Sequence, residues 1–225
     1  MAGRGRPRAS GPSSTGLTTE QEILQAAGKL FCTEGYGSVS TYRIARAARI
    51  SQATMYHYFA GKHEILSTLL LETVQPSVAF AEHLVTSDAP APARLWALCA
   101  FDTRLLVSGP ENLGALYLLP ELSDERFAAF HAERTRLRAV YRTLVRACPD
   151  VGDAVAQDLA DLVFGLVESA ILRRRQDLDG VGGTSIDDGF ATRTADAALR
   201  VVGLGPAAGM EAARAGQALA AAAPS

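Results

Sequence analysis

The sequence predicts an all-α protein, and three observations support that fold class. Apolar residues recur at helical spacing from Thr19 onward, and no segment alternates with the two-residue period of a strand. Ser, Thr and Asp precede many of the apolar segments, and Gly or Pro follows them, as helix caps and helix stops require. We therefore expect about nine helices, three in a first small unit and six in a second, larger one.

The first expected helix covers residues 19–31, with its apolar positions on one face. Thr18 is the expected N-cap. Gln21 stands at the third helical position, so the two residues match a capping box. Gly35 is expected to close this helix as a left-handed cap.

Two shorter helices follow and form a helix-turn-helix arrangement. Ser40 is the expected cap of a helix over residues 41–48, and Ser51 caps the next one. In that third helix Met55 and Phe59 share one apolar face, because they stand four residues apart. The other positions are small or hydrogen-bonding and none is acidic, which suits a helix that lies in the major groove of DNA.

Residues 19–66 resemble the DNA-binding domain of the TetR family of bacterial transcription regulators. The matching residues are Ile23-Leu24, Ala26-Ala27, Leu30-Phe31, Gly35-Tyr36, Ile44-Ala45, Ala48, Ile50-Ser51, Thr54 to Phe59, Lys62 and Glu64 to Leu66. One departure is Arg49, which stands in the turn where the family usually has Gly. If that turn needs a positive φ, Arg49 carries a strain of roughly 1 kcal/mol.

The resemblance implies which side chains contact DNA. The positions that match the family's groove-facing residues are Tyr42, Gln52, Ala53, Tyr56 and His57. The positions that match its phosphate-contacting residues are Ser40, Thr41, Thr54, Tyr58 and Lys62. By the same resemblance the chain is a homodimeric repressor that binds a palindromic operator in double-stranded DNA and is released by a small-molecule ligand.

The charge distribution agrees with a split between DNA contact and another task. Residues 1–66 hold eight Lys or Arg and four Glu, a net charge of +4, whereas the remainder carries −6. Residues 1–16 form a basic arm that should be disordered in isolation. In this arm Arg4 and Arg6 belong to an Arg-Gly-Arg-Pro sequence that resembles a minor-groove AT-hook; the alternative is a tail that adds only nonspecific phosphate affinity.

The rest of the chain is divided by Pro and Gly into further helices. We expect them over residues 62–86, 93–108, 110–118, 124–147 with Ser123 as the cap, 153–176, and from Ile186 or Asp187 to Val202. The expected domains are therefore the arm 1–16, a DNA-binding domain 17–66, a ligand-binding and dimerisation domain 67–204, and an Ala-rich tail 205–225 that is helical or frayed.

The last two long helices are expected to form the dimer interface. The segment 153–176 is apolar over more than one stripe, so it needs a cover on more than one side. Gly165 would allow a close approach of two helices. The expected interface residues are Leu162, Gly165, Leu166, Phe190, Ala195 and Leu199.

A ligand pocket between the helices of the second domain is the default expectation. The candidate lining residues are Phe80, Leu84, Trp96, Ala100, Thr103, Leu116, Tyr117, Leu119, Phe130, Arg134, Tyr141, Asp161, Phe164 and Glu168. For each of them the alternative is plain core packing or, for Asp161 and Glu168, exposure at the rim of the dimer.

No motif in the sequence predicts an enzyme, a metal site or a cofactor. Cys32, Cys99 and Cys148 lack zinc spacing and are expected to be reduced thiols. No secretory signal or membrane span is recognisable, so we expect a cytoplasmic, nucleoid-associated protein. A ligand-independent architectural DNA-binding protein, a thiol-based redox-sensing repressor that uses Cys32 or Cys99, and a helical binding protein or enzyme are the alternatives.

Overall fold

The computed structural model describes residues 16–178, 186–187 and 189–223, and this part of the chain is α-helical and 3-10-helical without a strand. The expected all-α fold class is confirmed. The α-helices are α1 (Thr19–Glu34), α2 (Thr41–Ala47), α3 (Gln52–Tyr58), α4 (Lys62–Thr86), α5 (Ala91–Val107), α6 (Ala128–Arg146), α7 (Asp153–Leu178), α8 (Phe190–Val201) and α9 (Pro206–Ala221). The short 3-10 helices are η1 (Tyr36–Ser38), η2 (Leu113–Leu118), η3 (Pro120–Ser123) and η4 (Glu125–Phe127).

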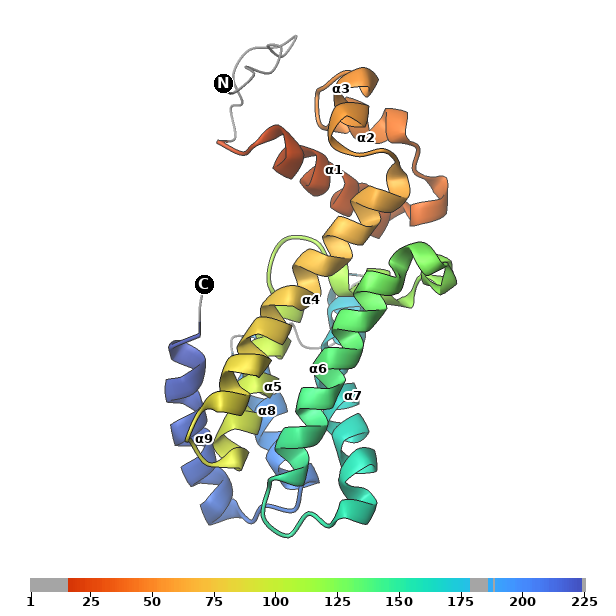
Figure 1. Cartoon of the computed structure of the whole chain (residues 1–225). Coiled ribbons are helices and arrows are strands. Elements are labelled where there is room, and N and C mark those ends of the chain that lie inside the picture. Colours follow the sequence, from red (N-terminus) through yellow and green to blue (C-terminus); the bar gives the residue numbers. More distant parts are fainter. Residues whose placement is uncertain (1–15, 179–185, 188, 224–225) are drawn as a thin grey trace, which may run out of the picture.

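Helices α1 to α3 lie together at one end of the molecule, and α4 runs from them along the second domain (Figure 1). Helix α5 is central in that domain, because it contacts α4, α6, α7, α8 and α9. Its apolar residues from Ala91 to Ala100 are buried, and Trp96 is fully enclosed. Because this part of the helix is covered on several sides, its sequence shows no continuous polar stripe.

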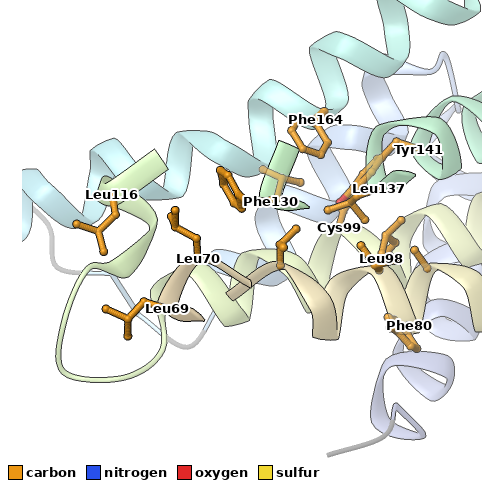
Figure 2. Close-up of a cluster of buried hydrophobic side chains, with 14 of the residues drawn as sticks. Leu69, Leu70, Phe80, Leu98, Cys99, Leu116, Phe130, Leu137, Tyr141 and Phe164 are labelled. Carbon is orange, nitrogen blue, oxygen red and sulfur yellow. The ribbon is translucent and has the colours of Figure 1, made fainter. Parts of the chain in front are cut away.

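The core of the second domain joins α4, α5, α6 and α7 (Figure 2). The rings of Tyr141 and Phe164 meet edge to face with centroids 5.2 Å apart, and those of Phe80 and Phe101 lie 4.6 Å apart. Such aromatic pairs stabilise by about 0.5–1.5 kcal/mol beyond the burial of their area. These two aromatic pairs therefore join α6 to α7 and α4 to α5.

The start of α1 is the expected capping box. The Thr18 hydroxyl accepts a hydrogen bond from the Gln21 backbone N–H at 3.2 Å, and the Gln21 side chain accepts one from the Thr18 N–H at 2.9 Å. At the other end Gly35 has φ 83° and ψ 142°. The positive φ agrees with the expected glycine stop, but the ψ is extended and not left-handed helical, because the chain turns directly into η1.

The turn between α2 and α3 has the Schellman geometry, with Arg49 at its left-handed position. Arg49 has φ 56°, its N–H donates to the Arg46 carbonyl at 3.2 Å, and the Ile50 N–H donates to the Ala45 carbonyl at 3.0 Å. The turn therefore requires a positive φ at Arg49. Arg49 therefore carries the strain that Gly avoids.

Several helix starts differ from the expectation. Ser123 does not cap α6. Instead the Asp124 carboxylate caps the start of η4 by accepting a hydrogen bond from the Arg126 N–H at 2.9 Å. The α-helix α6 therefore begins only at Ala128. Helix α5 begins two residues early, because Pro92 fits its first turn, where no backbone N–H is needed. Helix α8 begins later, at Phe190.

The Ala-rich tail is a packed helix. Helix α9 lies against α5, and Gly216 makes the approach possible, because a Cβ at this position would come within 2.8 Å of the Ala93 carbonyl oxygen. Of the two alternatives left open by the sequence, the helical one is therefore correct for residues 206–221.

Arg49→Gly tests the strain in the turn. Relief of about 1–2 kcal/mol of left-handed strain is partly offset by the greater freedom of Gly in the unfolded chain, about 0.4–1 kcal/mol. We expect the free energy of unfolding in urea to rise by about 0.5–1 kcal/mol. Asp150→Gly is the matched control, because Asp150 also has a positive φ, 64°, and Asp tolerates it better than Arg. A lower stability of Arg49→Gly than of the wild type would contradict this account.

Candidate nucleic-acid interface and ligand cavities

Helix α3 presents a polar face to solvent and an apolar face to the domain. Met55 is fully buried and Phe59, which follows the helix, is almost so. The residues expected to face the groove are exposed: Gln52, Ala53, Tyr56 and His57 on α3, and Tyr42 on α2. The structure thus brings all five of them to one end of the molecule, where they are accessible to a large partner.

Hydrogen bonds from α2 orient two of these side chains. The Thr41 hydroxyl lies 3.1 Å from the Tyr56 hydroxyl and accepts from the Gln52 amide at 3.3 Å. The Ser51 hydroxyl caps α3 by accepting from the Thr54 N–H at 3.0 Å. The exposed face of α3 is therefore partly pre-ordered before a ligand binds, which reduces the entropy cost of recognition.

Lys62 has a structural contact that the sequence did not reveal. Its ammonium donates to the Tyr36 carbonyl oxygen at 2.7 Å and lies 4.2 Å from the centre of the Tyr36 ring. An ammonium has three donors, so two are left for a phosphate. Lys62 also starts α4, whose first turn has no side-chain cap, and such a helix end attracts anions.

Not every basic residue of this domain is available to DNA. The Arg43 guanidinium donates two hydrogen bonds to the Glu34 carboxylate, and the one from Nη2 to Oε1 is 2.7 Å long. Arg46 and Arg49 are exposed and lie on either side of the turn. Arg4 and Arg6 lie outside the described residues.

Most of the expected ligand-lining residues belong to the core instead. Eight of them are buried among other apolar groups: Phe80, Leu84, Trp96, Ala100, Thr103, Leu116, Phe130 and Tyr141. Leu119 packs against the same core, and Asp161 is exposed and accepts from the Gln157 amide at 2.9 Å. In this conformation nine of these side chains lie in or against the core and Asp161 faces solvent, so the assignment of the ten residues to a ligand pocket stays a prediction.

The remaining four, Tyr117, Arg134, Phe164 and Glu168, line a small cavity of about 30 Å³. Arg134 pairs with Glu168 at 2.6 Å and lies over the Tyr117 ring at 4.8 Å. The Tyr117 hydroxyl donates to Thr73 at 2.7 Å. This volume is about that of one water molecule in the liquid, so the cavity does not hold an organic ligand in this conformation.

A buried carboxyl, Asp102, faces the same small cavity. The Tyr141 hydroxyl donates to its Oδ2 at 2.7 Å, while Oδ1 has no hydrogen-bond partner among the described residues. Burial raises the pKa of Asp102 to about 7. The carboxyl is therefore protonated through most of the acidic range, and the stability of the fold should decline as the pH rises toward 7.

The expected dimer residues fall into two groups. Leu162 is 61% exposed, and Gly165 is exposed with no atom within 4 Å of an added Cβ. Leu166 and Phe190 are half-buried. Ala195 and Leu199, in contrast, are buried within the subunit, where α8 packs on α5, so their side chains are not available to a second copy.

The thiols do not favour redox sensing. Cys99 and Cys148 are buried, and Cys32 is half-buried. Burial raises the pKa of Cys32 and of Cys148 to about 11, and that of Cys99 well above its ordinary value. A thiolate is the reactive form, so these groups react slowly at neutral pH.

Among the described residues, no helix is both long and apolar enough to cross a membrane, and no three His, Cys, Asp or Glu side chains are grouped as metal ligands.

A larger cavity, which sequence reasoning missed, lies between α1 and the second domain. Its one signal in the sequence is Gly28 in the middle of a helix, where a close neighbour is expected.

The geometry is that of a helix-turn-helix DNA-binding protein with a separate helical domain, and comparisons with known proteins agree. The family model described as "Bacterial regulatory proteins, tetR family" matches residues 23–69. The crystal structure of AmtR from Mycobacterium smegmatis is 39% identical with a TM-score of 0.79, covering 92% of this chain and 96% of that one. The HTH-type transcriptional regulator UidR of Escherichia coli (strain K12) is 23% identical over 160 residues, which cover 66% of this chain and 80% of that protein.

A third comparison, with the ketosteroid transcriptional regulator KstR2 of Mycobacterium tuberculosis, concerns the fold alone. The sequences are 20% identical, with a TM-score of 0.61 and coverage of 87% of this chain and 96% of that one.

The family model and the similarity to AmtR show that the chain belongs to the TetR family of DNA-binding transcriptional regulators.

Gln52→Ala tests base readout. The Gln52 amide can form two hydrogen bonds to an adenine edge. Its removal should lower the discrimination at one base pair of each half-site by about 1–3 kcal/mol. The measurement is a binding titration against operators with single base changes. The exposed Gln217→Ala on α9 is the control. An equal loss of affinity for all sequences would contradict base readout by Gln52.

Lys62→Met tests the phosphate contact, because it removes the charge and keeps the apolar stem. Affinity for all DNA sequences should fall, and the slope of log K against log salt should decrease by about one unit per half-site. Loss of the bond to the Tyr36 carbonyl should also lower the melting temperature. Arg104→Met, at an exposed position of α5, is the control for a general charge effect. An unchanged salt slope would show that Lys62 does not contact DNA.

Proposed function

We propose that this regulator is a homodimeric repressor that binds a palindromic operator and is released by a small-molecule effector. The observation that carries the proposal is the exposed α3 face with its ordered polar side chains, described above. The residues proposed to read bases are Tyr42, Gln52, Ala53, Tyr56 and His57. The residues proposed to contact phosphates are Ser40, Thr41, Thr54, Tyr58 and Lys62.

Dimerisation follows from the affinity that an operator requires. One recognition helix buries too little surface for specific affinity in the usual nanomolar range. The exposed apolar side chains of α7, Val155, Leu162 and Leu172, give the second domain a surface that a second copy can cover, and the exposed Gly165 allows close contact. A self-complementary contact there would generate a two-fold axis. Leu166 and Phe190 would lie at its margin.

The effector acts, in this proposal, on the separation of the two DNA-binding domains. Two recognition helices must match half-sites about 34 Å apart or a multiple of that distance. Helix α4 begins beside the DNA-binding domain and passes through the core of the second domain. In this proposal it transmits a change in one domain to the other. A ligand that prefers another separation lowers operator affinity by its differential binding.

The arm is proposed to add minor-groove contacts through Arg4 and Arg6. Its support is the Arg-Gly-Arg-Pro sequence and the attraction of a narrow A·T-rich groove for arginine. Deletion of residues 2–8 would then cost more affinity on A·T-rich than on G·C-rich flanks, whereas equal costs would indicate a nonspecific tail. We also propose a DNA-binding domain over residues 17–66 and a cytoplasmic, nucleoid-associated location. The expected second domain, 67–204, is extended to include α9, because that helix packs on α5.

Gly165→Trp tests the dimer, since an indole at this open position does not disturb the subunit. It should produce monomers, or dimers with a changed domain spacing, and abolish binding to the full palindrome. Light scattering and a DNA-binding titration on the same sample measure both effects. Ala139→Trp, at an exposed position of α6, adds the same side chain elsewhere and should leave both unchanged. A wild-type chain that is monomeric at micromolar concentration would contradict the proposed function.

A further inference from the structure

A cavity of about 470 Å³ lies between the DNA-binding domain and the second domain. Ligand sites in proteins usually measure about 300–1,000 Å³. Helix α1 forms one wall and α4 another. The other walls are the end of α5, the connector that joins α5 to η2 (residues 108–112) with the start of η2, and Arg174 of α7. A molecule in this cavity would therefore touch both domains at once.

The connector is attached firmly to α7. Arg174 is 8% exposed, and its guanidinium donates to the carbonyl oxygens of Leu106 at 3.1 Å, of Ser108 at 2.6 Å and of Gly109. The buried Asn112 amide donates to the Ile171 carbonyl at 3.0 Å. These bonds tie the connector to the helix that carries the exposed apolar surface.

The same segment also contacts the DNA-binding domain. Leu113 packs so closely on α1 that a Cβ added at Gly28 would come within 3.1 Å of its Cδ2 atom. The Cys32 thiol donates to the Asn112 carbonyl at 3.5 Å. The position of α1 relative to α7 thus depends on a segment that forms part of the cavity wall.

The cavity is apolar and carries acidic groups without a free cation. Its apolar lining consists of Leu17, Leu24, Leu69, Leu105, Leu106, Pro110 and Leu113. Glu72 from α4 and Glu111 from the connector add two carboxylates. Among the described lining residues the one cation is Arg174. Its guanidinium donates to backbone carbonyls of the connector and α5, and its charge also acts on Glu111.

The electrostatic environment of Glu72 fits this description. Burial, and then the nearby charge of Glu20, raise the pKa of the Glu72 carboxyl. A carboxylate that is partly desolvated and close to another acid is stabilised by any cation that enters. An anionic ligand, such as a fatty acid, would meet repulsion from these carboxylates.

We propose that this interdomain cavity is the effector site and that its ligand is a small apolar amine in its protonated form. The apolar body would contact the leucines, and the ammonium would pair with Glu72 and Glu111. A ligand that fills the cavity would separate α1 from the connector and thereby change the placement of the DNA-binding domain. This regulatory consequence rests on the proposed function, whereas ligand binding itself does not.

Three molecules of nearly equal shape test the ligand class: 4-phenylbutylamine, 4-phenylbutanol and 4-phenylbutyrate. Calorimetry on the full chain should give the amine an affinity at least about tenfold above that of the alcohol, since charge-assisted hydrogen bonds are the stronger ones. The carboxylate should bind most weakly. In the double variant Glu72→Gln, Glu111→Gln the amine should lose its advantage while the alcohol is unaffected.

Two further variants locate the site. Gln25→Trp places an indole at the exposed edge of the cavity and should weaken the binding of the amine and of the alcohol alike. Glu82→Gln, on α4 but away from the cavity, is the control and should change neither. Amine binding that persists in both the double variant and Gln25→Trp would overturn the proposal, and so would the absence of amine binding to the wild type.

Operator binding separates this inference from the proposed function. A titration without amine tests whether the chain binds a palindrome, and its failure would contradict the proposed function alone. With saturating amine we expect operator affinity to fall at least about fivefold, the lower end of usual allosteric coupling. The fall should be absent in Gln25→Trp. Amine that binds the cavity and leaves operator affinity unchanged would overturn the role of the cavity as an effector site.

Discussion

The buried guanidinium of Arg174 fixes the connector after α5, and the relation between the two domains depends on it. The guanidinium donates hydrogen bonds to the backbone carbonyls of Leu106, Ser108 and Gly109. The last carbonyls of a helix lack partners within the helix, so a cation from another helix is a suitable partner. Burial lowers the pKa of Arg174, yet a guanidinium keeps its charge at any physiological pH. Through this bond α7 determines where the connector lies, and the connector in turn supports α1.

Helix α4 provides the second link between the domains, and it has a weak point beside the interdomain cavity. Pro76 lies inside this 25-residue helix. A proline has no N–H to donate to the carbonyl four residues earlier, which here is that of Glu72. The side chain of Glu72 lines the cavity. The helix is thus easiest to bend at the position where the proposed ligand would sit, whereas its two ends are held by Lys62 and by the buried Leu84.

Local sequence signals predicted the DNA-binding domain well, because its structure is specified by short-range contacts. The capping box at Thr18, the caps at Ser40 and Ser51, and the positive φ of Arg49 all involve residues within a few positions of one another. The second domain was predictable only as a set of helices. An apolar residue that lines a pocket and one that packs in a core have the same pattern, so Phe80 and Trp96 were assigned to a pocket and lie in the core.

The dimer residues show the same limit in another form. Ala195 and Leu199 have the periodicity of an interface, but the pattern does not reveal which helices cover them. They are buried within the subunit, where α8 contacts α5, α7 and α9. The interdomain cavity was missed because its lining comes from residues as far apart as Leu17 and Arg174, which no local pattern connects. Gly28 was the one local indication, since a glycine within a helix usually has a packing reason.

The most direct test of the account is the dependence of operator affinity on half-site spacing. If α4 and the Arg174 contact hold each DNA-binding domain in a fixed place on the dimer, affinity should peak at one spacing of about 10 base pairs or a multiple of it. Five inserted base pairs move one half-site to the opposite face of the duplex, so affinity should then fall toward the nonspecific level. Arg174→Met should broaden the peak. A wild-type affinity that is equal at all spacings would contradict the account, because the two domains would then be independent.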